Sequence, residues 1–424
     1  MKNKKQSFNE VQGQSSNPLI LQSSNGLSGQ SSNPPILQSS NSVPVNEPLL
    51  NGNEKKYLNE CIDTGWISSE GPFIKQFEEM FAAKVGRKYG IAVANGSVAL
   101  DAAVVALGIG PGDEVIMPTF TIISCAAAIV RAGARPVLAD SDPVTWNMDF
   151  EKLKIKIENE IEKKGNKKIK AIMVVHIYGL PVDMDPVIEI ANKYGLKIIE
   201  DAAEMHGQTY KGRPCGSFGD ISTFSFYPNK HITTGEGGMI VTDDPELAEK
   251  CRSLRNLCFQ PKKRFVHEEL GWNFRMTNLQ AALGVAQLER LDEFVSRKRR
   301  MGRRYTELLL DVEGLQLPVE KTEYADNIYW VYGLVLKDDV PFDAEEAMQR
   351  LVQLGVGTRP FFWPMHEQPV FHKMGLYKGE TYPVAERIAR RGFYIPSGMA
   401  LTDEQMERVA EGVKEMMRVR RLEG

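Results

Sequence analysis

Short apolar runs rich in β-branched residues alternate with helix-length segments, and this alternation constrains the fold more than any other feature. The runs have the length of buried strands and lie at Gly90–Ala94, Glu114–Pro118, Arg135–Ala139, Ala171–His176, Lys197–Glu200, Ile221–Phe226 and Gly238–Val241. Helical patterns separate most of the early runs, at Ser97–Leu107, Ser124–Ala132 and Pro186–Tyr194. Such alternation is typical of βαβ units, so we predict an α/β fold with a mostly parallel seven-stranded sheet and helices on both faces. The last two runs are joined through a glycine-rich segment and are expected to depart from this alternation of strands and helices.

The second half of the chain predicts a smaller domain. A largely buried helix is expected at Thr277–Phe294, and Thr277 with Gln280 fits a capping box at its start. Beyond Lys298 the composition becomes charged and mixed, with one predicted strand and two predicted helices at Tyr329–Leu336, Ala344–Leu354 and Thr402–Arg418. We therefore predict a large domain over residues 54–297 and a small C-terminal α/β domain over residues 298–424.

The first 53 residues differ from the rest in composition. They are rich in Ser, Asn, Gln, Pro and Leu, and Gly13–Asn25 recurs as Gly29–Asn41 with one change. Two copies are too few for a solenoid, which needs neighbouring repeats to bury a shared face. We interpret residues 1–53 as a disordered low-complexity tail, and a short recognition peptide centred on Pro-Leu-Ile-Leu is the alternative.

Charge and composition exclude several classes of protein. The 424 residues carry 52 Lys and Arg against 55 Asp and Glu, so the net charge of -3 argues against nucleic-acid or membrane-surface partners. No run of 18 apolar residues is present to span a membrane, and the basic start lacks the apolar core of a signal peptide. The five cysteines show no disulfide framework and the six histidines no metal spacing, so we expect no metal site. A cytoplasmic enzyme is the expected class.

Ligands of open parallel sheets bind beyond the carboxyl ends of the strands, which directs attention to the residues that follow each run. After the first run, Gly96 and Ser97 open a helix, where free N–H groups and the helix dipole favour a phosphate. An ordinary strand-to-helix turn with Ser97 as N-cap explains the same residues. After Lys197–Glu200 stands Asp201, which either holds a protonated ring nitrogen of a cofactor or caps the next helix. Glu204 and His206 are close enough in sequence to reach the same ligand.

The segment Thr223–Gly238 is the most informative one. Lys230 follows a buried strand, where desolvation can lower the pKa of a lysine toward that of a nucleophilic amine. Ser225 supplies a hydroxyl nearby, and an exposed lysine in a hairpin loop is the alternative interpretation. Farther on, Asn273 and Arg275 can donate to a phosphate or carboxylate, or satisfy local backbone groups.

Several phrases occur together in a recognisable order. They are Gly-Pro-x(4)-Phe-Glu from Gly71, Asn-Gly-Ser-x-Ala-Leu from Asn95, Pro-Thr-Phe-Thr from Pro118, Val-His-x-Tyr-Gly from Val175, Glu-Asp-Ala-Ala-Glu-x-His-Gly from Glu200, Ser-Phe-x-x-x-Lys-x(4)-Gly-Glu-Gly-Gly from Ser225 and Asn-x-Arg-Met-Thr-x-x-Gln-Ala-Ala from Asn273. From about Lys55 to the C-terminus the chain resembles the DegT/DnrJ/EryC1/StrS family of pyridoxal-phosphate-dependent nucleotide-sugar aminotransferases. Within it, the phrases around Lys230 and Pro396–Gln405 are most similar to the GDP-perosamine synthases.

The resemblance implies fold type I, a homodimer with shared active sites, and pyridoxal 5'-phosphate as cofactor. Lys230 would be the catalytic lysine bonded to the cofactor, and Asp201 the partner of its ring nitrogen. Four further positions would bind the cofactor: Gly96, Ser97 and Ser225 at the phosphate, and Asn273 from the other subunit. Glu204 stands where many relatives have Gln near the ring hydroxyl, and Ile122 where several stack an aromatic ring on the cofactor, which leaves that face undefined.

The implied reaction is transfer of an amino group from L-glutamate to C4 of a nucleotide-linked 4-keto-6-deoxy sugar, GDP-4-keto-6-deoxy-D-mannose giving GDP-perosamine, as in O-antigen biosynthesis. A UDP- or dTDP-linked acceptor is the main alternative. Dehydratases of this family replace the lysine by His, and a non-catalytic regulator would not need Lys230, Asp201 and Ser225 together. Sugar contacts are expected from Trp66 to Gly71, from Tyr178 and from the segment between Arg359 and His366, although aromatic residues there equally suit packing.

Overall fold

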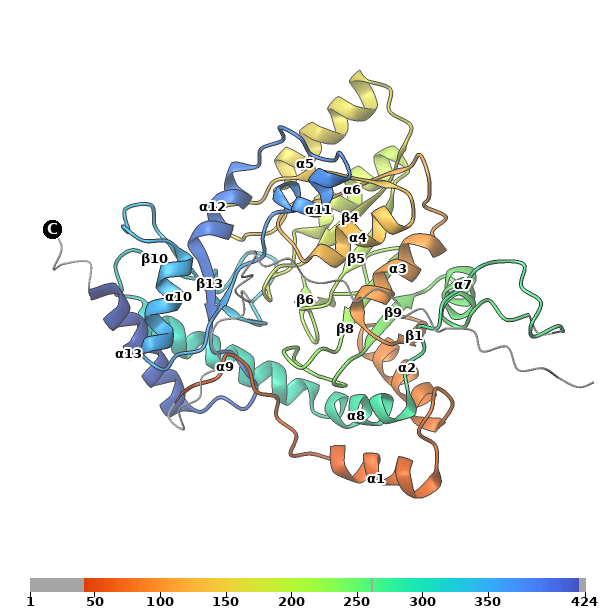
Figure 1. The fold of residues 1–424 in the computed structure, drawn as a ribbon, viewed down its shortest axis with the longest axis horizontal. Coiled ribbons are helices and arrows are strands. Elements are labelled where there is room, and N and C mark those ends of the chain that lie inside the picture. Colours follow the sequence, from red (N-terminus) through yellow and green to blue (C-terminus); the bar gives the residue numbers. More distant parts are fainter. Residues whose placement is uncertain (1–41, 261, 419–424) are drawn as a thin grey trace, which may run out of the picture. The chain divides into compact units, whose positions relative to one another are not determined.

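The computed structural model describes residues 42–260 and 262–418, and its central feature is a seven-stranded sheet (Figure 1). In spatial order the strands are β1 (Tyr89–Val93), β9 (Gly238–Thr242), β8 (Ile221–Ser225), β5 (Lys197–Asp201), β4 (Ile169–Val175), β2 (Glu114–Pro118) and β3 (Arg135–Ala139). Only β9 runs antiparallel to its neighbours, β1 and β8. The predicted mostly parallel sheet is confirmed, and so is the departure at the glycine-rich connection.

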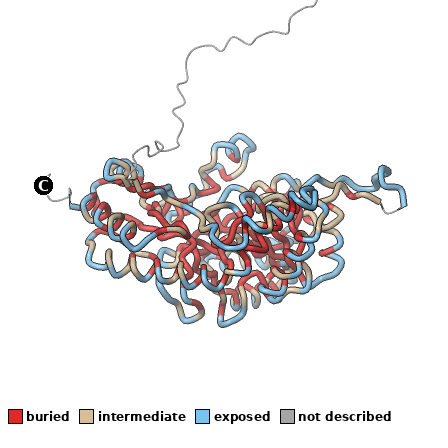
Figure 2. The backbone as a smooth tube through the Cα atoms, turned by 90° about the horizontal axis from the view of Figure 1, so that it is seen from below, coloured by how far each residue is buried: buried red, intermediate tan, exposed pale blue. Residues whose placement is uncertain are grey.

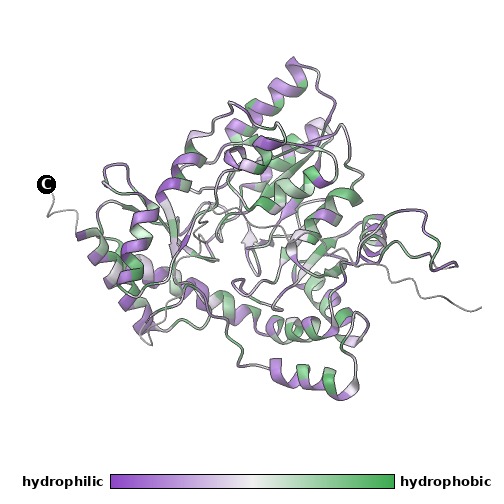
Figure 3. Cartoon of the chain, in the orientation of Figure 1, coloured by the Kyte–Doolittle hydropathy of each residue, from purple (hydrophilic) through white to green (hydrophobic). Residues whose placement is uncertain are grey.

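Helices cover both faces of this sheet. One face is covered by α3 (Gly96–Ala106), α4 (Ile123–Arg131) and α7 (Pro245–Arg255). The opposite face is covered by α2 (Pro72–Lys84), α5 (Phe150–Ile157), α6 (Met184–Tyr194) and α8 (Asn278–Leu288), with α1 (Glu54–Thr64) packed on α8. A π-helix, Glu158–Lys163, continues α5, and a two-stranded ribbon joins β6 (Thr209–Tyr210) to β7 (Arg213–Pro214). In Figure 3 the apolar α3 is mostly green and the charged α5 mostly purple.

The strands alternate their side chains between two apolar cores because successive residues of a strand point to opposite faces. Along β4, Ile172 and Val174 join the core under α2, α6 and α8, while Met173 and Val175 join the core under α3 and α4. In Figure 2 the backbone of the buried residues, drawn in red, accordingly concentrates in the interior of the molecule. A sheet buried on both faces explains why the runs read as continuously apolar.

A second sheet lies in the C-terminal part, in the order β10 (Leu315–Gln316), β11 (Tyr332–Leu336), β13 (Gly392–Ile395) and β12 (Arg359–Pro360). Its associated helices are α10 (Ala344–Gln353), α12 (Pro383–Arg391) and α13 (Asp403–Arg418), with a short 3-10 turn at Met365–Glu367 and α11 (Pro369–Lys373). The long helix α9 (Leu291–Leu309) leads into this part, so the predicted domain boundary at residues 297 and 298 falls inside one continuous helix (Figure 1).

The helix predicted at Thr277–Phe294 is two helices, because the chain breaks between α8 and α9 at Glu289 and Arg290. Neither residue is a helix breaker, so the sequence carries no signal for the break. The capping box of Thr277 and Gln280 is confirmed.

The segment preceding α1 is ordered against the C-terminal part, although the predicted tail extends to residue 53. Val43 is buried and forms a parallel bridge to Val356, and the carbonyls of Val45 and Glu47 accept hydrogen bonds from the amides of Ser397 and Ala400. The duplicated repeat lies outside the described residues. In the described ranges, no helix combines the length and apolarity that a membrane span requires.

Candidate active site

A cavity of about 790 Å³ opens at the carboxyl ends of the parallel strands. Six of the predicted cofactor-binding residues line it, namely Gly96, Ser97, Asp201, Glu204, Ser225 and Lys230, and so does Ile122. These six come from three places in the sequence: the start of α3, the end of β5 with the loop that follows it, and the end of β8 with the loop that follows it. The topology gathers them because parallel neighbours present their carboxyl ends at one edge of the sheet.

Asp201 is the last residue of β5 and is 3% exposed. Its Oδ2 accepts a hydrogen bond from the thiol of Cys125 on α4 at 3.1 Å, and its Oδ1 accepts one from the amide of Ala203 at 3.1 Å. Burial raises the pKa of the Asp201 carboxyl, and these two donors oppose that rise. A buried carboxylate facing a cavity is suited to bind a cationic group, which would replace the lost solvation.

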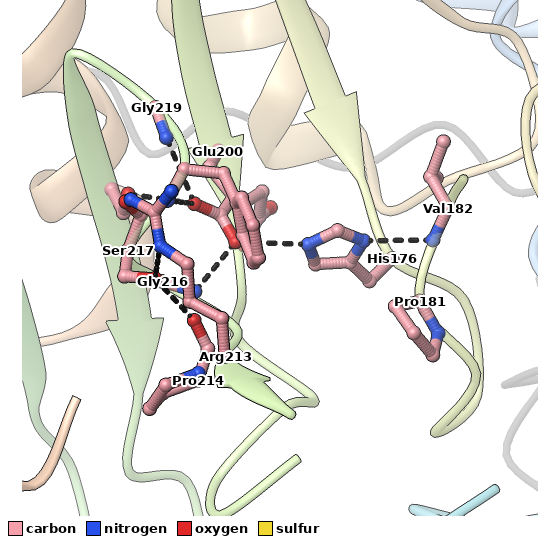
Figure 4. A network of polar contacts seen from close by, with 12 residues as sticks. His176, Pro181, Val182, Glu200, Arg213, Pro214, Gly216, Ser217 and Gly219 are labelled. Atoms are coloured by element: carbon pink, nitrogen blue, oxygen red, sulfur yellow. Dashed lines mark hydrogen bonds and ion pairs between the residues drawn. The ribbon is translucent and has the colours of Figure 1, made fainter. Parts of the chain in front are cut away.

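The residue before Asp201 anchors the same strand end (Figure 4). Glu200 is fully buried and accepts hydrogen bonds from His176 Nε2 at 3.1 Å, Ser222 Oγ at 3.0 Å and the amides of Gly216, Phe218 and Gly219. Burial alone would raise the pKa of Glu200, but the contact with His176 and the amides lowers it to about 2. The Val182 amide donates to His176 Nδ1, so that nitrogen carries no proton and Nε2–H donates to Glu200.

Lys230 and Glu204 face one another in the cavity, with 3.7 Å between Nζ and Oε1. Burial lowers the pKa of the Lys230 amine, and the charges of Glu204 and Asp201 oppose that change. Burial raises the pKa of Glu204 to about 8, although the charge of Lys230 and a 2.7 Å hydrogen bond from the Tyr178 amide to Oε2 oppose it. Both groups are therefore shifted toward their neutral forms, as nucleophilic or acid–base chemistry near neutral pH requires.

The cradle at the start of α3 is built by close approach of two elements. A side chain at Gly96 would place its Cβ 2.7 Å from the Cβ of Ser225, so only glycine fits there. The N-cap of α3 is Asn95, whose side chain accepts from the Val98 amide at 3.1 Å, so the alternative with Ser97 as N-cap is wrong. The Ser97 hydroxyl instead lies 2.7 Å from that of Ser124, at the cavity wall. A helix N-terminus with hydroxyls beside it is suited to an anion such as phosphate.

The remaining predicted site residues lie outside the cavity lining. Tyr178 is buried behind Glu204, and its hydroxyl accepts from the Phe362 amide. His366 is buried between Thr119 and Glu386, at 2.9 Å and 3.0 Å, in a group with Glu367. Arg359 is exposed on β12, Trp66 is half exposed, and the side chain of Asn273 accepts from Arg275 at 2.8 Å.

His206 packs away from the cavity, so the suggestion that it reaches the same ligand as Asp201 is wrong. Its ring lies 5.6 Å from Phe224 and 5.4 Å from Phe226, centroid to centroid. Burial lowers its pKa to about 3, so this histidine is a neutral member of the core.

Phe362, from the predicted substrate segment Arg359–His366, lines the cavity, but sequence reasoning missed other lining residues, among them Thr121, Ser124, Tyr227, Trp330 and Tyr394. Thr121 and Ser124 follow β2, so the rule of strand ends could have found them. Trp330 and Tyr394 come from the C-terminal part, and no local pattern indicates that they reach the large sheet.

Comparison with known proteins agrees with this geometry. A model of the DegT/DnrJ/EryC1/StrS aminotransferase family matches residues 48–414. The chain is 41% identical to the GDP-perosamine synthase of Escherichia coli O157:H7 over 373 residues, which is 88% of this chain and 98% of that relative. It is 36% identical to the putative pyridoxal phosphate-dependent aminotransferase EpsN of Bacillus subtilis, over 87% of this chain and 94% of EpsN. The crystal structure of the aminotransferase TlmJ from Streptoalloteichus hindustanus superimposes with a TM-score of 0.80 at 31% identity, covering 89% of this chain and 99% of TlmJ.

Proposed function

The chain belongs to the DegT/DnrJ/EryC1/StrS aminotransferase family, and we propose that it transfers an amino group from L-glutamate to C4 of a nucleotide-linked 4-keto-6-deoxy sugar. This proposal rests on one observation: the same cavity contains Lys230, Asp201 and the cradle at Gly96. The proposed acceptor is GDP-4-keto-6-deoxy-D-mannose, giving GDP-perosamine. Relatives that are 41% and 40% identical and named GDP-perosamine synthase support that choice.

The cavity residues fit pyridoxal 5'-phosphate as the cofactor. Gly96, Ser97 and Ser225 would hold the phosphate, because α3 presents its N-terminus there and Gly96 leaves the backbone accessible. Asp201 would accept a hydrogen bond from the protonated ring nitrogen, which would give its buried carboxylate a cationic partner. When bound, the cofactor supplies an electron-accepting ring that stabilises negative charge at the carbon being deprotonated.

Lys230 is the proposed catalytic residue. Burial lowers the pKa of its amine and so favours the unprotonated form, which is the form that can bond to a carbonyl. With substrate bound, the free amine of Lys230 would act as the general base that takes a proton from the substrate carbon and as the general acid that gives it back. Glu204 lies 3.7 Å away and is proposed to contact the cofactor ring and to hold the charge state of Lys230.

A second copy of the chain is proposed to complete the site. Asn273 does not line the cavity of its own subunit, and the segment leading to it carries Phe265 and Leu270 at 80% and 91% exposure. This segment projects after α7 in Figure 1. Large apolar side chains this exposed indicate a protein interface. In a homodimer, Asn273 would then reach the cofactor phosphate of the partner.

Substrate contacts are proposed for two groups of residues. Trp66 and Arg359 are accessible and are proposed to bind the nucleotide sugar directly. Tyr178 and His366 are buried, so they are proposed to act by shaping the wall, Tyr178 through Phe362 and Glu204.

Replacement of Lys230 tests the proposed chemistry. We expect Lys230→Ala to abolish amino transfer while the protein stays folded, since an alanine removes the amine without filling the cavity. Turnover and circular dichroism measure the two properties, with Lys75→Ala at an exposed position of α2 as the control. Retained turnover would refute the role of Lys230.

The acceptor is tested with a panel of GDP-, UDP- and dTDP-linked 4-keto-6-deoxy sugars in the presence of glutamate and pyridoxal phosphate. We expect an amino sugar from the GDP-linked substrate with the highest kcat/KM. A higher kcat/KM with a UDP- or dTDP-linked sugar would refute the GDP-linked acceptor and would still support amino transfer.

A further inference from the structure

Trp330 is a cavity residue to which the proposed chemistry gives no role. It precedes β11 in the C-terminal part and is 4% exposed. The face of its indole ring lies against the amine of Lys230, with 3.9 Å between Nζ and the ring centroid. The rings of Tyr178 and Phe362 pack near the indole, with centroids 5.7 Å and 6.4 Å from its centroid.

The indole also holds the backbone next to Lys230. Trp330 Nε1 donates to the carbonyl of Asn229 at 2.8 Å, and Asn229 immediately precedes Lys230. The carbonyl of Pro228 accepts from the side chain of Asn46 at 3.0 Å. Two successive carbonyls are thus bound by side chains that are more than 100 residues away in sequence, which restricts where Lys230 can lie.

Trp330 is itself fixed by a buried amine. Lys298 on α9 is 2% exposed, and its Nζ donates to the carbonyls of Trp330, at 2.8 Å, and Ser397. In the described ranges no ion pair to a carboxylate is formed by Lys298. Burial and the charge of Lys230 lower the pKa of Lys298 to about 7. A lysine buried without an acidic partner is costly, so its retention here is explained by the two carbonyls that it binds.

We propose that Trp330 is a positioning residue for Lys230. The indole N–H fixes the carbonyl of Asn229, and the ring face stabilises the protonated amine while excluding water from it. This inference rests on the proposed role of Lys230 as the proton-transferring group. A face that favours the ammonium form is useful at the stage when the free amine holds the proton.

The test measures the amine itself in the cofactor-free protein. Lys230 is labelled by formaldehyde and cyanoborohydride between pH 6 and pH 11, and peptide mass spectrometry gives the apparent pKa of the amine. Trp330→Leu and Trp330→Met keep water out but remove the aromatic face, so we expect the pKa of Lys230 to fall by roughly half a unit or more. Trp330→Phe keeps a weaker aromatic face, so the pKa of Lys230 in this variant should lie between its value in those two variants and its value in the native protein.

Controls separate the ring from general destabilisation. Phe342→Leu removes a comparable contact outside the cavity, where the Arg350 guanidinium lies 4.3 Å from the ring centroid, and should leave the labelling curve of Lys230 unchanged. Exposed Lys75 reports the labelling chemistry in the same samples. The proposal is overturned if Trp330→Leu and Trp330→Met leave the Lys230 curve unchanged or raise the pKa. The labelling needs no turnover, so a failure of the proposed aminotransfer would be seen separately, in the substrate panel.

Discussion

Glu204 and Lys230 form a buried acid–base pair whose charges set the chemistry of the cavity. Burial raises the pKa of Glu204 to about 8 and lowers that of Lys230, so the two values approach each other. A smaller difference between the two pKa values lowers the cost of moving a proton within the pair, which suits acid–base chemistry at this place. The stability of the cofactor-free protein should therefore depend on pH through the raised pKa of Glu204.

We expect Glu204→Gln to stabilise the cofactor-free protein increasingly as the pH rises. The pKa of Glu204 is raised from 4.5 to about 8 by folding, so its contribution is fully present below pH 4.5 and is lost as the pH rises through 8. Glutamine has no proton to lose and avoids that cost. Thermal unfolding from pH 5 to pH 9 measures the difference in Tm, which should grow with pH. A difference that stays constant across this range would contradict the raised pKa.

Site residues at strand ends were predictable because residue types suited to the chemistry stand in the sequence where predicted strands end. Asp201 and Lys230 follow apolar runs and Ser225 lies near the end of one, and the rule of parallel sheets places them together. Cys125 and Trp330 were not predictable, since their contacts with Asp201 and Lys230 join segments that are far apart in sequence.

At the scale of elements, the end of β5 is held by Glu200, which joins it to the loop before β8 and to the end of β4 (Figure 4). Five donors to one buried carboxylate fix the backbone on which Asp201 follows. Removing the charge leaves some of those donors without an acceptor, and a buried donor without an acceptor lowers the free energy of unfolding.

We expect Glu200→Gln to destabilise the protein by about 2–4 kcal/mol, because the amide brings an N–H toward groups that already donate. Urea unfolding at pH 7 measures the change. The pKa of Glu200 is lowered from 4.5 to about 2, so its contribution is present above pH 4.5 and is lost as the pH falls through 2. The destabilisation should therefore shrink in acid. Glu79→Gln, at an exposed pair with Lys75, is the control, and an equal effect there would contradict a special role for Glu200.

The elements themselves were largely predictable from the sequence. The predicted runs at 114–118 and 135–139 coincide with β2 and β3, and the capping box marks the start of α8. The break before α9 was missed because no glycine or proline causes it. The ordering of residues 42–53 was missed for a different reason: their polar composition is that of a tail, and contacts with segments far away in sequence order them, among them hydrogen bonds to residues 355–357 and 397–400.

At the scale of the whole molecule, the cavity of one chain lacks a predicted cofactor ligand, Asn273. Exposed apolar residues of the segment that precedes it are suited to contact a second copy. A closed two-fold dimer would supply Asn273 to both sites at once.

Mixed dimers test whether Asn273 acts across the interface. We expect Asn273→Ala and Lys230→Ala to be inactive or weak alone, and their co-expressed heterodimer to regain one complete site, about half the native activity. Purification through two different affinity tags isolates the heterodimer for assay. If Asn273 served its own subunit, both sites of the heterodimer would be defective and no activity would return.

The most direct measurement follows the nitrogen atom. The protein is incubated with pyridoxal phosphate, L-glutamate labelled with nitrogen-15 and GDP-4-keto-6-deoxy-D-mannose, and the sugar product is analysed by mass spectrometry and NMR. We predict that the label appears at C4 of the sugar, with one 2-oxoglutarate formed for each amino sugar. A protein that binds the cofactor but leaves the label in glutamate with every 4-keto sugar supplied would contradict the proposed amino transfer.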